Sequence, residues 1–213
     1  MEWMTDYIQF LSERYPDILK YTVEHLYMSF VSVVLGIVIA IPLGIYLSKS
    51  EQKLVNSFVF TIVNIFQTIP TIALLAIMIP FLGIGLKPAL VALFLYSLLP
   101  LLRNTYTGIK SVDPKIIEAA RGMGYSSMQR LIRIELPLAF PYIISGIRVT
   151  TVYIISWTTL AAVIGAGGLG GLILSGLGFN SKPLIFTGTI MAIVIAVLAD
   201  QLIGRAEKRL SYK

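Results

Sequence analysis

Long apolar runs, separated by short segments that carry nearly all the charges, constrain this chain more than any other feature. The mean hydropathy is +0.83 and only 13% of the 213 residues are charged, against roughly a quarter in an ordinary soluble protein. Runs of about 20 apolar residues are typical of helices that cross a membrane. The sequence therefore predicts an all-α integral membrane protein, with one domain over residues 1–213.

Five membrane spans are predicted, at about residues 26–47, 55–82, 88–109, 138–164 and 184–204. The first covers roughly 33 Å at 1.5 Å per residue, enough for a hydrocarbon core of about 30 Å. Proline kinks helices, and Pro70 follows Gln67-Thr68-Ile69 inside the second span. Whether that span is one helix or two half-helices stays open.

The distribution of basic residues predicts the orientation, because cytoplasmic loops carry an excess of Lys and Arg. With the N-terminus outside and the C-terminus in the cytoplasm, four basic residues are external: Arg14, Lys20, Lys87 and Lys182. Twelve are internal: Lys49, Lys53, Arg103, Lys110, Lys115, Arg121, Arg130, Arg133, Arg205, Lys208, Arg209 and Lys213. Residues 1–20 alternate apolar and acidic positions, and we expect them to form an external helix at the membrane interface.

Composition argues against several classes of protein. The net charge of +6 sits in loops between spans, so nucleic-acid binding is not expected. Cysteine is absent and His25 is the single histidine, so we expect no metal centre, and no residue pattern predicts a cofactor. Acids at Glu2 and Asp6 stand where a secretory signal would be basic. Gly165, Gly167 and Gly170 match G-x-G-x-x-G without the required strand, and are interpreted as an external flexible turn.

The loop at residues 110–137 carries signals for two short helices. Asp113 suits an N-cap and Pro114 the first helical position, so a helix should begin there, and glycine at 122 and 124 should end it. Ser126 and Gln129 form a capping-box pattern for a second helix, which Pro137 should stop. Helices of about eight residues are unstable alone, so both need support from the bundle and from a partner.

The same loop resembles the cytoplasmic coupling loop of ABC importer permeases. The resemblance rests on Glu118-Ala119-Ala120, Arg121, Gly124 and, after nine residues, Ile134-x-Leu136-Pro137. In that family the loop inserts into the ATPase and carries its motion to the spans. The chain has no G-x-x-x-x-G-K-[ST] pattern, so the resemblance implies a non-enzymatic subunit, with ATP hydrolysed on a partner.

Three further stretches, at residues 67–70, 99–109 and 164–170, are similar to bacterial osmoprotectant permeases for glycine betaine, carnitine and choline. That resemblance implies a type I, methionine-permease-like bundle in the bacterial cytoplasmic membrane. It implies two ATPase subunits, an external binding protein, surrounding lipid and a second permease chain, identical or different. A permease for another small solute (an amino acid, a sulfonate or a bile-like compound) stays open, as does export. A channel would not need the loop. An intramembrane enzyme would need a nucleophile–base pair, and none is visible in the sequence.

Polar residues inside the spans are candidates for a solute path, because such side chains prefer the bundle interior. They are Asn64, Gln67, Asn104, Tyr153, Ser156 and Trp157. Packing between helices explains each of them equally well. Arg148 lies well inside a span, where an unpaired charge costs roughly 2.5–3.5 kcal/mol, and Asp200 is its expected partner. The pair either fixes helix packing or takes a direct part in gating or in contact with the substrate.

Overall fold

The computed structural model describes the backbone of residues 2–211 and the side chains of residues 5–209, and within that range it is helical without strands. The helices are α1 (Glu2–Lys49), α2 (Lys53–Thr68), α3 (Thr71–Leu82), α4 (Leu86–Lys110), α5 (Pro114–Gly122), α6 (Ser127–Arg130), α7 (Leu136–Thr158), α8 (Leu169–Gly178) and α9 (Lys182–Ser211). A π-helix, Leu131–Glu135, leads into α7, and a 3₁₀ helix, Thr159–Ile164, follows it.

Four helical stretches in the described residues are long and apolar enough to cross a membrane, and the α2–α3 pair makes up to five. The expectation of about five spans is therefore confirmed. The chain bends by 101° between α2 and α3, so the segment around Pro70 is two helices and not one straight span. Ile69 and Pro70 have extended backbone there, as expected before and at a proline.

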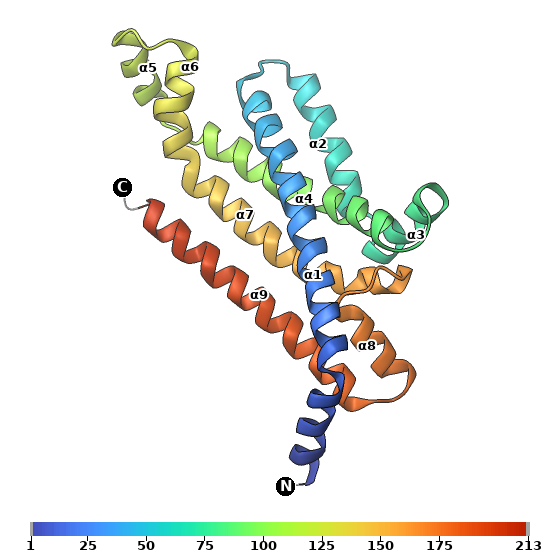
Figure 1. Ribbon diagram of the computed structural model, residues 1–213. Helices are drawn as coiled ribbons and strands as arrows, with labels where there is room; N and C mark the ends of the chain where they lie inside the picture. The colour runs from blue at the N-terminus through green and yellow to red at the C-terminus, as the bar shows by residue number, and fades with distance from the viewer. Residues whose placement is uncertain (1, 212–213) are drawn as a thin grey trace.

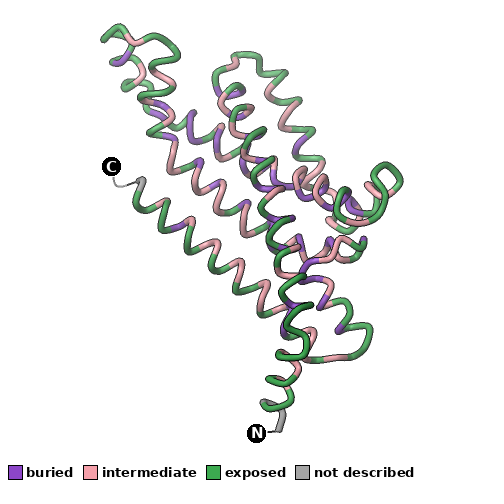
Figure 2. The backbone as a smooth tube through the Cα atoms, in the orientation of Figure 1, coloured by how far each residue is buried: buried purple, intermediate pink, exposed green. Residues whose placement is uncertain are grey.

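The bundle is centred on α1, α4 and α7, which pack on one another, while α9 lies along α7 and α2 and α3 flank the other side (Figure 1). The main core contains Met28, Leu75, Tyr96 and Ile154, contributed by α1, α3, α4 and α7. Buried residues concentrate in these central helices, whereas much of α9 is exposed or half-buried (Figure 2). Exposed apolar side chains on helices of this length are what a lipid environment requires.

The N-terminal segment continues into the first span without a break, and its predicted external place at the membrane interface stays a prediction. Residues 2–49 form one helix, and Pro16 lies inside it. Ile18 is buried against Leu169 and Leu172 of α8, and Tyr7 shares a 2.9 Å hydrogen bond with Thr187 of α9. The segment is therefore an extension of the first span that packs on α8 and α9, and Met1 lies outside the described residues.

Pro137 does not stop the second loop helix, contrary to the prediction. Residues 127–164 form one continuous helical stretch in which the π-helix precedes the proline. Leu136 N–H bonds to the carbonyl of Leu131, five residues back, which widens the turn ahead of the proline ring. Pro137 follows this wide turn directly, at the junction between the π-helix and α7, so the irregular hydrogen bonding accommodates its missing N–H. The second helix of the loop is thus continuous with a membrane span.

Candidate functional site

The loop at residues 110–137, called here the coupling loop, projects beyond the bundle at the end opposite the N-terminus (Figure 1). Asp113 caps α5 by accepting a hydrogen bond from the Lys115 N–H at 2.8 Å, and Pro114 occupies the first turn. Ser126 and Gln129 form a complete capping box at α6. The helix starts that the sequence predicts are therefore confirmed at both positions.

The turn between the two short helices depends on Gly124, which has a φ of +84°. A residue with a Cβ is strained in this left-handed region, so glycine suits the position. Tyr125 N–H donates to the carbonyl of Ala120 at 3.1 Å, and Met123 N–H to that of Ala119 at 3.0 Å. These bonds satisfy the last carbonyls of α5 and close the turn.

The residues of the coupling-loop motif divide between an exposed and a buried side. Glu118, Ala119, Arg121, Gly124 and Pro137 are exposed, Ile134 and Leu136 are half-buried, and Ala120 is buried. Apolar side chains also point outward from the loop: Ile116, Met123, Met128 and Ile132 are 42%, 69%, 65% and 56% exposed. Exposed apolar side chains at an end of the molecule beyond the bundle mark a surface suited to a protein partner.

One residue within the motif, Glu135, makes a contact that the sequence did not indicate. Its side chain is only 3% exposed and forms an ion pair with Lys49, the last residue of α1. The positive charges of Lys110 and Arg130 also repel this ammonium group. The two partners are 86 positions apart, so no local pattern could have predicted their contact.

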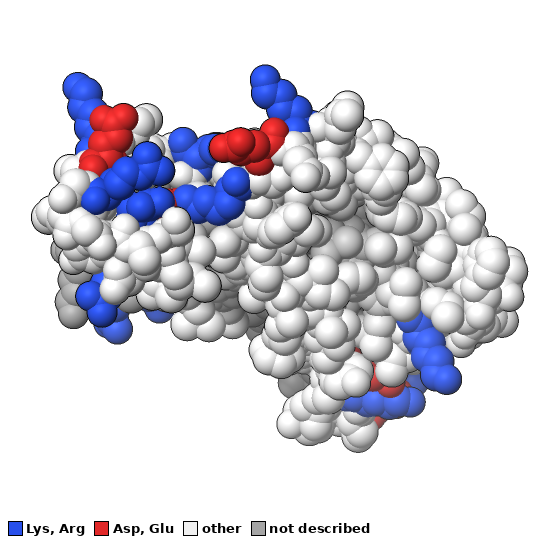
Figure 3. Space-filling model, turned by 90° about the horizontal axis from the view of Figure 1, so that it is seen from above, with Lys and Arg blue, Asp and Glu red and all other residues white. Residues whose placement is uncertain are grey.

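Charged side chains gather in separate patches, with a broad uncharged surface between them, when the molecule is seen from above (Figure 3). The structure holds no membrane, so the side on which each terminus lies remains a prediction.

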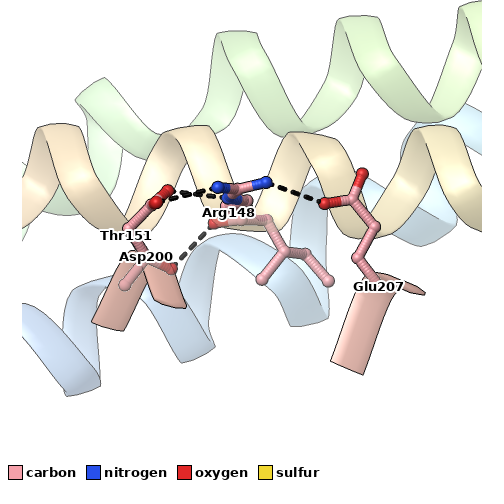
Figure 4. A network of polar contacts seen from close by, with 5 residues as sticks. Arg148, Thr151, Asp200 and Glu207 are labelled. Carbon is pink, nitrogen blue, oxygen red and sulfur yellow. Dashed lines mark hydrogen bonds and ion pairs between the residues drawn. The ribbon is translucent and has the colours of Figure 1, made fainter. Parts of the chain in front are cut away.

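Arg148 of α7 binds the side chains of two acids on α9 (Figure 4). Its guanidinium donates to both carboxylate oxygens of Asp200, at 2.6 and 2.8 Å, and to Glu207 at 3.1 Å. Gly204 lies between the two acids on the helix, and a Cβ there would stand 3.0 Å from Arg148 Cζ. The expected partnership with Asp200 is present, while the participation of Glu207 was not predicted.

The predicted path residues do not form one group. Asn64 is exposed on α2, and the side-chain oxygen of Gln67 is buried there without a partner. Asn104 packs against Gly146 at the α4–α7 contact and donates to the Pro100 carbonyl at 2.8 Å. Ser156 is exposed, and its hydroxyl donates to the Val152 carbonyl at 3.0 Å.

Tyr153 and Trp157 are brought together with a residue that the sequence interpretation missed. Their rings stack with centroids 5.7 Å apart, and the Trp157 ring lies 4.6 Å from that of Tyr96. The Tyr96 hydroxyl donates to the carbonyl of Ile69, at the break between α2 and α3. An aromatic cluster therefore adjoins the broken helix pair, and Tyr96 satisfies a carbonyl that the break leaves free.

The turn with Gly165, Gly167 and Gly170 is only partly the external turn that was expected. Gly165 and Gly167 have positive φ, but Gly170 belongs to α8 and packs on Thr159. The N–H of Gly168 donates to Glu24 of α1 at 3.0 Å. The glycines here allow close packing of α8 on the bundle.

Comparison with known proteins matches residues 40–212 to the family described as binding-protein-dependent transport system inner membrane component. The carnitine transport permease protein OpuCB of Listeria monocytogenes is 43% identical over 206 residues, covering 97% of this chain and 94% of that protein. The glycine betaine/carnitine/choline transport system permease protein OpuCB of Bacillus subtilis is 42% identical over 210 residues, covering 99% and 96%.

The fold is similar to that of a solved transporter. An inward-facing structure of the MetNI methionine ABC transporter matches with a TM-score of 0.81 and 29% identity. The match covers 91% of this chain and 96% of that one. The predicted methionine-permease-like architecture is therefore confirmed.

Proposed function

This chain belongs to the family of binding-protein-dependent transport system inner membrane components, and from that premise we propose that it passes quaternary ammonium osmoprotectants into the cell. It is a multi-pass subunit of the cytoplasmic membrane and has the architecture of an ABC permease. The proposed solutes are glycine betaine, carnitine and choline, in keeping with the names of relatives that are about 42% identical over nearly the whole chain.

The observation that carries the ATP-driven permease role is the capped, exposed coupling loop built onto a membrane span. Met123 and Met128 offer apolar side chains to a partner, and Glu118 and Arg121 offer charges beside them. A pair of ATPase subunits is the proposed partner, which makes ATP hydrolysis the task of separate chains. Since α6, the π-helix and α7 are continuous, a push on the loop would move a whole span.

The remaining assembly is proposed on the same basis. A second permease chain, identical or different, would complete the membrane unit, and an external binding protein would deliver the solute. The N-terminus would lie outside and the C-terminus in the cytoplasm, because the predicted cytoplasmic segments carry twelve Lys and Arg residues and the predicted external segments four.

The stacked rings of Tyr153 and Trp157 are the proposed contact for the passing solute. A quaternary ammonium group binds aromatic faces through cation–π attraction, worth roughly 0.5–2 kcal/mol per site. Tyr153 is 48% exposed, so its ring remains accessible on α7. Asn64, Gln67 and Ser156 are proposed as polar members of the path, and Asn104 as a packing residue beside it.

The test is uptake of radiolabelled glycine betaine, carnitine and choline by cells that carry the complete operon. Gly124→Ala and Gly122→Ala are a matched pair, because both positions have open space around them and only Gly124 has positive φ. Strain of about 1–2 kcal/mol at Gly124 should deform the loop and reduce uptake, while Gly122→Ala should not. Glu118→Ala should reduce uptake with the complex still assembled.

The alternative solutes are separated by the same assay. The MetNI likeness leaves methionine as the first amino acid to include. Uptake of methionine without uptake of the three quaternary ammonium compounds would overturn the proposed solute class and leave the permease role standing. Efflux of preloaded solute that depends on Glu118 would instead assign the chain to export.

A further inference from the structure

An apolar groove of about 480 Å³ lies on the outside of the bundle between α1, α7 and α9. In the first half of α9 the helices α1 and α9 touch, where Thr22 of α1 lies 3.9 Å from the sulfur of Met191. Further along they separate and leave the groove, with Phe30 and Leu202 70% and 63% exposed at its edges. The lining is Leu26, Ser29, Phe30, Val33, Val34, Ile37, Thr151, Ile155, Ile195, Leu198, Ala199, Leu202 and Ile203.

The groove offers few groups that could bind a polar ligand. Its two polar residues are Ser29 and Thr151, and both hydroxyls are already engaged. Ser29 shares a 3.0 Å hydrogen bond with Thr158, and Thr151 donates to the Ile147 carbonyl at 2.7 Å. A polar or charged solute would lose its hydration here without compensation, whereas a hydrocarbon chain would not.

One end of the groove leads to unpaired positive charge. The stripe of α9 that faces the groove follows helical spacing through Ile195, Ala199 and Leu202 and continues to Ala206 and Arg209. Leu202 also lines a neighbouring hollow of about 380 Å³, whose other walls are Arg205, Ala206 and Arg209. In the part of the chain that the structure describes, neither arginine forms an ion pair, because Asp200 and Glu207 both bind Arg148.

We propose that this groove binds one anionic phospholipid, with an acyl chain along α1 and α9 and the phosphate on Arg205 and Arg209. Basic pockets between spans are where acidic lipid headgroups bind membrane proteins. The apolar length and the cationic end match the two parts of such a lipid, and the proposal is independent of the solute that the transporter carries. A second copy fits less well, since the chain has net charge +6 and the acids closest to this end are already paired.

The assembled transporter, reconstituted in phosphatidylcholine, can be labelled with traces of phosphatidylglycerol that carries a photoreactive acyl chain. We expect labelled peptides to contain Phe30, Leu198 or Leu202. Arg205→Gln with Arg209→Gln should lower this labelling by about fivefold for each charge removed, toward that of a photoreactive phosphatidylcholine. Both arginines are exposed, so the variant should fold.

Matched variants control for position and charge. Ala199→Trp should fill the groove and abolish labelling, whereas Val197→Trp, on another face of α9, should leave it unchanged. Lys87→Gln removes an exposed charge from α4 and should also have no effect. Equal labelling by both lipids that persists in the arginine variant would overturn the proposal. So would a disulfide between two copies that carry Leu198→Cys, since the natural chain has no cysteine. Neither readout depends on transport.

Discussion

Glu135 lies buried against the ammonium group of Lys49, so the end of α1 is joined by charge to the π-helix that connects the coupling loop with α7. The acid is the buried partner, at 3% exposure of its side chain, while Lys49 is 42% exposed. The two positions should therefore respond differently to substitution, because only the acid depends on its partner for compensation.

Lys49→Met should destabilise the assembled complex more than Glu135→Gln. The first leaves a buried carboxylate without its ion pair, at a cost of about 1–3 kcal/mol once the exposure of Lys49 is considered. The second removes the charge and retains the shape, for about 1 kcal/mol. Thermal unfolding of the purified complex measures both, and a larger loss for Glu135→Gln would contradict the prediction.

Salt provides the control for this pair. Without the acid, Lys49 faces the charges of Lys110 and Arg130. Repulsion between partly exposed cations is screened by salt, so the stability that Glu135→Gln loses should be partly recovered as ionic strength rises. The stability that Lys49→Met loses should depend less on ionic strength, because its cause is the burial of an unpaired acid.

Arg148→Met should be more harmful than Asp200→Asn. The first leaves Asp200 and Glu207 without their shared cation, while the second leaves Arg148 its bond to Glu207. The triple variant Arg148→Met, Asp200→Asn, Glu207→Gln should recover most of the stability, because it removes every charge together. Thermal unfolding and uptake are the measurements. A stable triple variant without uptake would assign the pair to gating.

Ser126→Ala should loosen α6 while Ser127→Ala should not. Ser126 accepts the Gln129 N–H in the capping box, whereas Ser127 meets only the Arg130 guanidinium, at 3.2 Å. Loss of an N-cap costs about 1 kcal/mol, which corresponds to roughly fivefold faster amide exchange when the end of a helix opens. Hydrogen exchange of residues 127–130 in the complex tests this, and equal rates in both variants would contradict it.

Some of these local contacts could be predicted from the sequence alone. Asp113, Pro114, Ser126 and Gln129 act on neighbours within three positions, so their caps were predictable. The sequence raised a break at Pro70 without deciding it, because the size of the bend depends on packing. Arg148 and Asp200 are 52 positions apart, and their contact was predictable only because an unpaired charge in a membrane requires a partner.

Contacts that depend on the whole bundle were missed. Nothing near Lys49 or Glu135 indicates that they meet, because the packing of α1 against the π-helix decides it. Pro137 was predicted to end a helix, and the preceding π-turn removes that conflict. Gly170 was assigned to an external turn together with Gly165 and Gly167, yet it belongs to α8, which tertiary packing stabilises there.

Tyr153→Leu should lower the maximal rate of uptake more than Tyr153→Phe. The phenylalanine keeps an aromatic face stacked on Trp157, and the leucine does not. A loss of about 1 kcal/mol of cation–π attraction would slow passage roughly fivefold without changing solute capture by a separate binding protein. Uptake kinetics with a fixed amount of binding protein measure this. Equal rates of uptake in the two variants would show that the aromatic face of Tyr153 does not contribute to solute passage.

Gly170→Ala should prevent assembly, while Gly178→Ala should be tolerated. A Cβ at Gly170 would overlap the carbonyl oxygen of Thr159, a backbone atom of the 3₁₀ helix that cannot move alone. Gly178 is also helical and has nothing within 4 Å of that position, so alanine there should gain up to about 1 kcal/mol of helix propensity. Overpacking of this kind typically costs 1–3 kcal/mol or more. The yield of complex in detergent measures the difference. A normal yield for Gly170→Ala would mean that α8 can move away from the 3₁₀ helix without loss of the bundle.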